Sequence, residues 1–238
     1  MSILETKYLT KTFGGLVALN EVCFELNENE ILGIIGPNGA GKTTFINVIS
    51  GIYLPSSGKV VFHGKDISEL PAHIRCKLGI GRTFQIVRPL QGLSLLQNVM
   101  LGSLFGRGNS LKEARKEARG ICEFLDLAQI GRDIAKLTVL EIKKMEIARA
   151  LATKPKILFL DEVMAGLNID ETKEMIESVK KIRSQGISIC VIEHVMSVIR
   201  ELTERVIVLD RGEKIAEGPY EGVSDNPRVI SAYLGEEE

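Results

Sequence analysis

The sequence lacks any apolar run long enough to cross a membrane. Its longest runs are about six residues, whereas a spanning helix needs about 20. The opening stretch MSILETKYLTK has no apolar segment typical of a secretion signal. The net charge is −1, so no global basic field attracts the chain to nucleic acid or anionic lipid. We therefore expect a cytoplasmic protein that meets a membrane only through a partner.

Clusters of metal-binding side chains are also lacking. The four cysteines lie far apart in the sequence, and no pair has metal-ligand spacing. Cys23 and Cys190 lie in apolar, strand-like segments, so we expect both thiols to be buried. The three histidines form no cluster either, and only His194 follows an apolar run at a position of interest.

A phosphate-binding motif is present near the N-terminus. Residues 36–43 read GPNGAGKT and match G-x-x-x-x-G-K-[ST]. An apolar run at 31–35 predicts a buried strand before this loop, and 44–50 predicts a helix after it. Glycines allow backbone N–H groups to turn toward phosphate oxygens, and the helix N-terminus adds its positive end. A chance glycine-rich turn is the alternative, which the lysine, the hydroxyl and the flanking elements disfavour.

Each residue type in this loop has an expected role. Lys42 is expected to reach the β- and γ-phosphates, and the Thr43 hydroxyl is expected to bind Mg²⁺. The residues expected to bind the nucleotide here are Gly36, Pro37, Asn38, Gly39, Ala40, Gly41, Lys42, Thr43 and Thr44.

A second motif ends an apolar strand with two carboxylates, in the sequence ILFLDE at 157–162. At the carboxyl end of a strand beside the phosphate-binding loop, or P-loop, at 36–43, Asp161 is expected to hold Mg²⁺ through water. Glu162 follows directly, where a general base can polarise an attacking water. The alternative is that Glu162 only caps the next turn. Because kinases and GTPases commonly lack this second acid, its presence favours hydrolysis.

Apolar patterns divide the rest of the chain into three kinds of segment. Residues 3–30 alternate around a Gly14-Gly15 turn, and 59–62 add a further strand, which predicts a small antiparallel sheet. Residues 71–136 are mainly helical in pattern. A capping box at Ser110 and Glu113 there opens a helix whose expected apolar face is Leu111, Ala114, Ala118, Ile121, Cys122 and Leu125. From residue 138 on, apolar strands alternate with helices, as in a parallel sheet covered on both faces.

Taken together, these motifs resemble the ATP-binding subunit of an ABC transporter over nearly the whole chain. The resemblance implies an α/β P-loop NTPase core with a mostly parallel sheet, an N-terminal antiparallel β subdomain and an inserted helical lobe. It implies a single ABC ATP-binding domain over residues 1–238, with the helical lobe at about 86–153. ATP and Mg²⁺ are the implied cofactors.

The same resemblance implies roles for residues outside the motifs at 36–43 and 157–162. Phe13, in the stretch KTFG, is placed where an aromatic ring stacks on adenine, although a core aromatic is the alternative. Gln85, in RTFQ, resembles the Q-loop glutamine that completes the Mg²⁺ and water shell and senses the γ-phosphate. His194, in VIEH, resembles the switch histidine that hydrogen-bonds the γ-phosphate. AGLN at 165–168 resembles the D-loop, with Asn168 where aspartate is commoner.

One family hallmark is altered in this chain. Where family members have Leu-Ser-Gly-Gly-Gln opening a helix, this chain has Leu137, Thr138, Val139, Leu140 and Glu141. Thr138 and Glu141 keep capping-box spacing, so the helix start is expected to survive. In the family, this helix N-terminus meets the ATP held by the other subunit, and the two larger side chains would crowd that approach. The segment is either a tolerated variant, with a homodimer possible, or one side of a heterodimer with a second ABC ATPase subunit. We favour the heterodimer.

The expected function is ATP hydrolysis that powers an ABC importer, for branched-chain amino acids or related solutes. Glu162 is the expected base, and His194 and Gln85 complete the catalytic set. The tail at 226–237 and the segments around residues 85, 165 and 194 resemble such importers. The expected partners are integral membrane permeases, docked near residues 86–101, and indirectly an extracytoplasmic solute-binding protein. The subunit would then sit peripherally on the cytoplasmic face of the membrane.

Three other functions fit parts of the sequence. A soluble ABC-type ATPase acting on nucleic acid is disfavoured, because the chain has no second cassette, coiled-coil insertion or zinc-type cysteines, and we expect no nucleic-acid partner. A nucleotide-binding partner with weakened activity remains an alternative because of the altered hallmark. A P-loop kinase or GTPase is disfavoured by the Asp161-Glu162 pair, Gln85 and His194.

Overall fold

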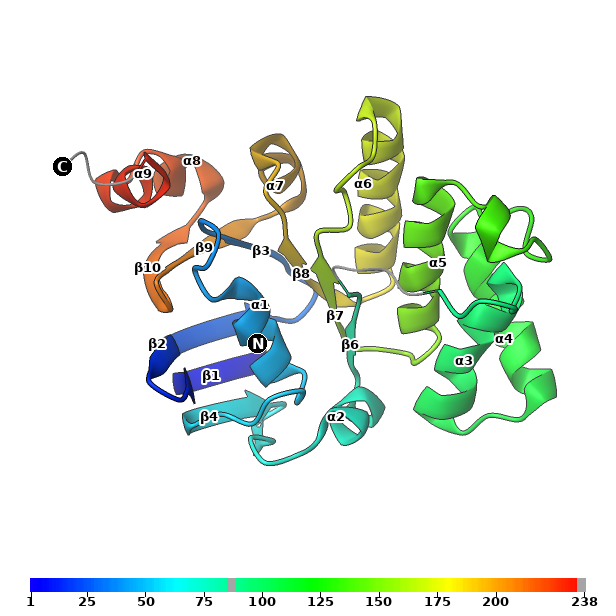
Figure 1. Cartoon of the computed structure of the whole chain (residues 1–238), viewed down its shortest axis with the longest axis horizontal. Helices are drawn as coiled ribbons and strands as arrows, with labels where there is room; N and C mark the ends of the chain where they lie inside the picture. Colours follow the sequence, from blue (N-terminus) through cyan, green and yellow to red (C-terminus); the bar gives the residue numbers. More distant parts are fainter. Residues whose placement is uncertain (85–88, 235–238) are drawn as a thin grey trace.

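Two sheets with flanking helices make up the part of the chain that this computed structural model describes, residues 1–84 and 89–234 (Figure 1). The first sheet is antiparallel, with the order β2–β1–β4–β5. The second has the order β10–β9–β3–β8–β7–β6 and is parallel except at the β9–β10 hairpin. The predicted α/β class, with a mostly parallel sheet beside an antiparallel one, is confirmed. The strands are β1 (Ser2–Phe13), β2 (Leu16–Asn27), β3 (Ile31–Ile35), β4 (Ser57–Phe62), β5 (Lys65–Asp66), β6 (Ile80–Arg82), β7 (Ile157–Asp161), β8 (Ser188–Ile192), β9 (Arg205–Asp210) and β10 (Glu213–Gly218).

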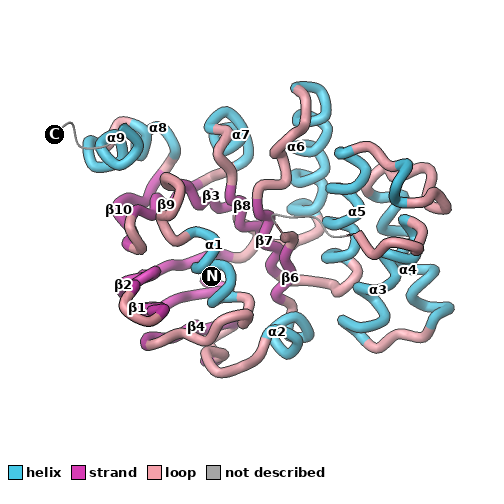
Figure 2. The backbone as a smooth tube through the Cα atoms, in the orientation of Figure 1, coloured by secondary structure: helices cyan, strands magenta, loops and turns pink. Residues whose placement is uncertain are grey.

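Helices α3, α4 and α5, which we call the helical lobe, gather at one side of the second sheet (Figure 2). Each begins after a capping box in which a Ser or Thr side chain and a Gln or Glu side chain bond each other's backbone N–H. Among the described residues, no helix is long and apolar enough to cross a membrane. The helices are α1 (Lys42–Ile49), α2 (Ala72–Leu78), α3 (Leu95–Arg107), α4 (Leu111–Phe124), α5 (Val139–Leu151), α6 (Ile169–Ser184), α7 (Met196–Leu202), α8 (Tyr220–Ser224) and α9 (Pro227–Leu234).

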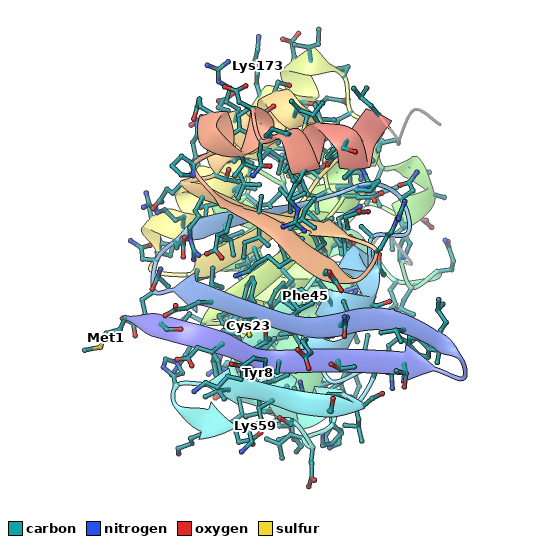
Figure 3. All side chains as sticks on the ribbon, turned by 90° about the vertical axis from the view of Figure 1, so that its left-hand side faces the viewer. Met1, Tyr8, Cys23, Phe45, Lys59 and Lys173 are labelled. Carbon is teal, nitrogen blue, oxygen red and sulfur yellow. The ribbon has the colours of Figure 1, made fainter. Side chains whose placement is uncertain are left out.

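The central strand β3 supplies side chains to two separate apolar cores, because successive residues of a strand point to opposite faces. Leu32 and Ile34 pack with α1 and the antiparallel sheet. Ile31 and Ile35 pack on the opposite face, in the core that α5, α6 and α7 share. Helix α1 therefore lies between the two sheets, and Figure 3 labels its residue Phe45 behind the strands of the first sheet. This burial fixes the P-loop, which joins β3 to α1.

The buried side chain of Arg75 joins α2 to the end of α1. Its guanidinium donates to the carbonyl oxygens of Val48 and Ile49, each at 2.8 Å, and to those of Leu70 and Ser68 at 2.8 and 2.7 Å. Burial lowers the pKa of Arg75 to about 10, mainly by disfavouring the charged form. Arg75 thus adds a donor to carbonyl groups of the last turn of α1, where helix carbonyls lack an i+4 partner.

Two burial expectations were wrong. The Cys23 side chain is only half-buried, because it lies on the face of β2 opposite to the buried Val22 and Phe24, whereas Cys190 is fully buried as predicted. Leu111 lies at the first position of α4 and is 69% exposed, although Ala114, Ala118 and other residues of the predicted face are buried. The capping box was predicted correctly, but a residue in the first turn can lie beyond the edge of the packed face.

Candidate functional site: a nucleotide cleft at the strand ends

A cleft of about 480 Å³ opens at the carboxyl ends of the central parallel strands. Loops at this edge of a parallel sheet commonly form binding sites. The P-loop residues from Asn38 on line it, and so do Glu162 and His194. The remaining described lining residues were not predicted from sequence: Leu16, Val17 and Ala18 from β2, and Arg211 and Gly212 from the β9–β10 turn.

The backbone of the P-loop depends on two of its glycines. Gly36 has φ 149°, and a Cβ there would lie 2.0 Å from the carbonyl oxygen of Leu209. Gly41 has φ 101°, and a Cβ there would lie 2.7 Å from the carbonyl oxygen of Ala18. Any other residue at either position would clash with backbone. Close packing of β9 and β2 against the loop therefore requires glycine at these two positions, and the curled loop turns its N–H groups toward the cleft.

Lys42 lies inside this curl and is 7% exposed. Its Nζ donates to the carbonyl oxygens of Gly36 at 2.6 Å and Pro37 at 2.9 Å. Burial lowers the pKa of Lys42, and the nearby Glu162 and Asp161 carboxylates oppose that shift. The ammonium is thus held within the loop, at the start of α1, where an anion would also meet the helix N-terminus.

Asp161 ends β7 and is 2% exposed. Within the described part of the chain, neither of its carboxylate oxygens has a hydrogen-bond partner, and the nearest cation is Arg82, whose Nη2 lies 3.7 Å from Oδ2. Burial raises the pKa of Asp161, although Arg82 lowers it. A buried carboxylate without donors fits a site for a hard cation, whose preferred ligands are oxygens. The exposed Thr43, in the first turn of α1, offers a hydroxyl oxygen as a second ligand.

Glu162 and His194 come together because their strands are adjacent. Asp161 of β7 pairs with Ile192 of β8, so the residues after both strand ends leave the sheet side by side. Oε1 of Glu162 lies 2.8 Å from Nε2 of His194. The contact places a carboxylate and an imidazole together at the edge of the cleft, where each can handle a proton or bind an oxygen.

The Q-loop prediction falls partly outside the described residues. Gln85 lies in the gap at 85–88, so its position is not described. The residues just before it are fixed on both sides. The Phe84 N–H donates to Oε1 of Glu146 on α5 at 3.0 Å, and Arg82 donates to Oδ1 of Asn47 on α1 at 2.7 Å. This segment therefore connects the P-loop helix to the helical lobe.

The altered hallmark segment retains a well-formed helix start. Thr138 is the N-cap of α5, with Glu141 as its capping-box partner, and Arg132 forms an ion pair with Glu141 at 3.1 Å. Val139 is 50% exposed, whereas Leu140 is 9% exposed and belongs to the core. Neither this segment nor Leu137 lines the P-loop cleft of the same chain in the described residues. The segment thus lies apart from the P-loop cleft.

Phe13 lies at the end of β1 and is 41% exposed. Its ring packs edge-on against Tyr53 at 5.2 Å between centroids, and Lys11 lies 5.0 Å from the ring centre. Phe13 is absent from the described lining of the cleft, although the hairpin after it contributes Leu16 and Val17. The ring is exposed beside the cleft.

Comparisons with known proteins place these features in a family. Residues 19–165 match the ABC transporter family, and residues 213–238 match a segment described as "branched-chain amino acid ATP-binding cassette transporter". A probable branched-chain amino acid transport ATP-binding protein of Archaeoglobus fulgidus is 38% identical, with 99% of this chain and 96% of that protein covered. The high-affinity branched-chain amino acid transport ATP-binding protein BraF of Pseudomonas aeruginosa is 36% identical, with 98% of each chain covered.

Solved structures agree with the sequence relatives. A nucleotide-free ATP-binding cassette from an ABC transporter has a TM-score of 0.91 and 32% identity, with 99% of this chain and all of that chain covered. An ABC transporter cassette in its ADP conformation has a TM-score of 0.90 and 33% identity, with the same coverage. The predicted family is confirmed by these matches.

Proposed function

Because the chain belongs to the ABC transporter family of ATP-binding proteins, we propose that it hydrolyses ATP to power an importer of branched-chain amino acids or related solutes. The observation that carries the hydrolytic part is the contact between Glu162 and His194 at the edge of the P-loop cleft, at 2.8 Å. The solute class rests on the transport roles for which the relatives are named and on the match at 213–238.

ATP is bound, in this proposal, by residues 36–44. The backbone N–H groups of the curled loop receive the phosphate oxygens, and the N-terminus of α1 favours their negative charge. Lys42 exchanges its loop carbonyl partners for phosphate oxygens, which its position within the loop supports. Phe13, which is 41% exposed, is proposed to contact the adenine ring.

Thr43 and Asp161 are proposed to hold Mg²⁺, and Gln85 to complete the shell. The buried, hydrogen-bond-free carboxylate of Asp161 supports this assignment among the described residues. When bound, Mg²⁺ neutralises charge on the β- and γ-phosphate oxygens.

Glu162 is proposed to accept a proton from the attacking water. His194 holds the Glu162 carboxylate from one side and is proposed to hydrogen-bond the γ-phosphate after Glu162 turns toward water. The two side chains come from adjacent strands whose backbones are buried and paired, which keeps the pair in place. This preorganisation is proposed to reduce the cost of aligning the base with the attacking water.

The site is proposed to be completed by a second ABC ATPase subunit. Thr138 to Glu141 would face the nucleotide of that subunit, since they lie away from this chain's own cleft. The exposed Val139 side chain occupies the surface where the family has glycine. We propose a heterodimer for this reason, and a partner with weakened activity at one of its two sites is the second candidate that the same observation favours.

An apolar groove of about 540 Å³ is proposed to receive the membrane permeases. It lies between the second sheet and the helical lobe, and its lining includes Phe84, Leu90, Leu101 and Phe105. Phe105 is 77% exposed, which suits a residue that is covered by a partner. The proposed docking segment, 86–101, borders this groove, although 86–88 are not described. Such docking would hold the subunit at the cytoplasmic face of the membrane, with the solute-binding protein reached only through the permeases.

Reconstitution in liposomes tests this function. The chain would be combined with a second ATPase subunit, the permeases and a solute-binding protein encoded beside it. ATP hydrolysis is expected to rise when leucine-loaded binding protein is present outside, and to stay basal with a Lys42→Ala chain. Hydrolysis that ignores the binding protein, in a complex that has assembled, would contradict the transport function.

A further inference from the structure

Glu162 adopts a backbone conformation that is unusual for a residue with a side chain. Its φ is 52°, in the left-handed region that glycine normally occupies. Such conformations persist only when surrounding contacts hold them, and they concentrate at functional sites. The direction of the Glu162 carboxylate depends on this backbone, so the contacts that hold it bear on the proposed reaction.

Three hydrogen bonds hold the peptide groups of Glu162. Its N–H donates to the carbonyl oxygen of Ile192 at 2.9 Å, which ties the turn to β8. Its carbonyl oxygen accepts from the Ala165 N–H at 3.3 Å, within the turn itself. The same carbonyl oxygen accepts from Nζ of Lys143 at 3.1 Å. Lys143 lies on α5, so the helical lobe reaches across to the backbone of the proposed base.

A second ionisable side chain, at the end of β8, contacts the same turn. Glu193 follows β8 directly, is 2% exposed, and accepts from the Met164 N–H through Oε1 at 2.8 Å. Met164 lies two residues after Glu162, and Glu193 directly precedes His194. Glu193 thus links the turn after Glu162 to the residue that contacts the Glu162 carboxylate.

Lys143 and Glu193 both contact one short turn, at the Glu162 carbonyl oxygen and at the Met164 N–H. Burial raises the pKa of Glu193, and the charge of Lys143 opposes that shift. Burial lowers the pKa of Lys143, and Glu193 opposes that shift. The ionisable groups that face Glu193 are Lys143 from α5 and Glu162 from the turn, with the backbone of His194 beside it. The two side chains therefore support the turn from α5 and from the end of β8.

We propose that Lys143 and Glu193 are positioning residues that hold the turn 162–164 and thereby aim the Glu162 carboxylate. This inference rests on the proposed hydrolytic role of Glu162. Lys143 lies five residues after Thr138, the N-cap of α5. A small shift of α5 when a second subunit docks on its N-terminus therefore moves Nζ relative to the Glu162 carbonyl. Nucleotide binding at the second subunit's site would in this way change the position of Glu162, the proposed base of this chain's own site.

The test compares Lys143→Met with Lys143→Arg, which keeps a donor, and with Glu193→Gln, which keeps an acceptor but removes the charge. Lys144→Met is the matched control, because Lys144 lies on the same helix but contacts the Leu125 carbonyl oxygen and Glu174. In the assembled dimer, Lys143→Met is expected to lower kcat about tenfold or more, with KM for ATP within about twofold. Lys143→Arg is expected to recover most of kcat, and Lys144→Met to keep it. Equal kcat in Lys143→Met and wild type would overturn the proposal.

Amide hydrogen exchange gives a readout that does not depend on hydrolysis. The Met164 and Ala165 amides are expected to exchange about tenfold faster in Lys143→Met and in Glu193→Leu than in wild type or Lys144→Met, since their turn loses a support. Unchanged exchange would overturn the positioning role. If the variants exchange faster than wild type as expected, but wild type hydrolyses no ATP with its partner, the proposed function fails while the positioning role of Lys143 and Glu193 is supported. The two failures are therefore distinguishable.

Discussion

Nε2 of His194 lies 2.8 Å from Oε1 of Glu162, although the two residues are 32 positions apart in the chain. The contact follows from the register of β7 and β8, which ends both strands at the same edge of the sheet. It joins the proposed base to the proposed γ-phosphate sensor.

Lys42→Ala and Glu162→Gln are expected to separate binding from turnover. Loss of Lys42 removes the cation held within the P-loop, so nucleotide binding should fall by about a hundredfold or more. Glu162→Gln keeps the side-chain volume and should bind ATP about as well as wild type. Equilibrium binding of a fluorescent ATP analogue checks both variants. Weak binding by the glutamine variant would assign Glu162 to nucleotide binding instead.

Asp161→Asn is expected to remove the Mg²⁺-dependent part of nucleotide binding. In wild type, ATP with Mg²⁺ at a hundred times its Kd should stabilise the fold by about 3 kcal/mol. The variant should show only the stabilisation that ATP gives in the presence of EDTA, because its amide is a poor Mg²⁺ ligand. Thermal unfolding with ATP, with and without Mg²⁺, measures this, and Asp210→Asn at the end of β9 serves as the control. A full Mg²⁺ effect in Asp161→Asn would remove Asp161 from the metal site.

Glu193 is expected to make stability depend on pH. Burial raises its pKa from the ordinary 4.5 to about 7, so the folded chain holds a proton that the unfolded chain releases. The stability this gives is complete below about pH 4.5 and is lost as pH rises through about 7. Relative to Glu193→Gln, wild type should therefore lose about 3 kcal/mol of unfolding free energy across this range. Urea unfolding of both proteins between pH 5 and 8 measures the difference, and a constant difference would contradict the assignment.

Arg75→Met is expected to destabilise the fold through the end of α1. The methionine fills similar space but removes the guanidinium donor from four backbone carbonyl groups, of which that of Val48 still accepts from the Gly51 N–H at 3.1 Å. Unsatisfied buried acceptors are costly, so we expect a loss of about 3 kcal/mol. Urea unfolding measures it. A loss below about 1 kcal/mol would indicate that water replaces the guanidinium.

The helix start at Thr138 is expected to prevent a stable homodimer. A purified Glu162→Gln chain with MgATP should sediment as a monomer, and should form a dimer only with a second ATPase subunit that has glycines at these positions. Adding Val139→Gly removes the exposed side chain and should strengthen self-association, while Leu140→Gly alone would mainly open the core. A tight homodimer of the unmodified Glu162→Gln chain with two trapped ATP molecules would contradict the heterodimer.

Local signals in the sequence were enough to predict the strand, loop and helix around Lys42. The same holds for the capping boxes at Ser110 and Thr138, because each depends on contacts within a few residues. The order of the strands in the second sheet is a different matter. It joins β3 to β8 and β9, more than 150 residues away, and no local pattern encodes that pairing.

Residues that act through distant contacts were missed for the same reason. Lys143 is one charge among several on α5, and nothing in its neighbourhood indicates that it reaches the Glu162 carbonyl. Glu193 was noted only as part of the segment around His194. Arg211 and Gly212 line the cleft from the β9–β10 turn, which the apolar pattern did not reveal. An Arg-Gly pair after an apolar strand is a turn signal that could have indicated this hairpin.

ATP hydrolysis by the assembled dimer tests the central claim most directly. Phosphate release would be measured with the wild-type chain and with Glu162→Gln, each combined with the same second subunit and saturating MgATP. The account predicts that the variant retains nucleotide but releases phosphate at least about a hundredfold more slowly. A Glu162→Gln chain that turns over at the wild-type rate, with the partner's own site inactivated, would contradict it.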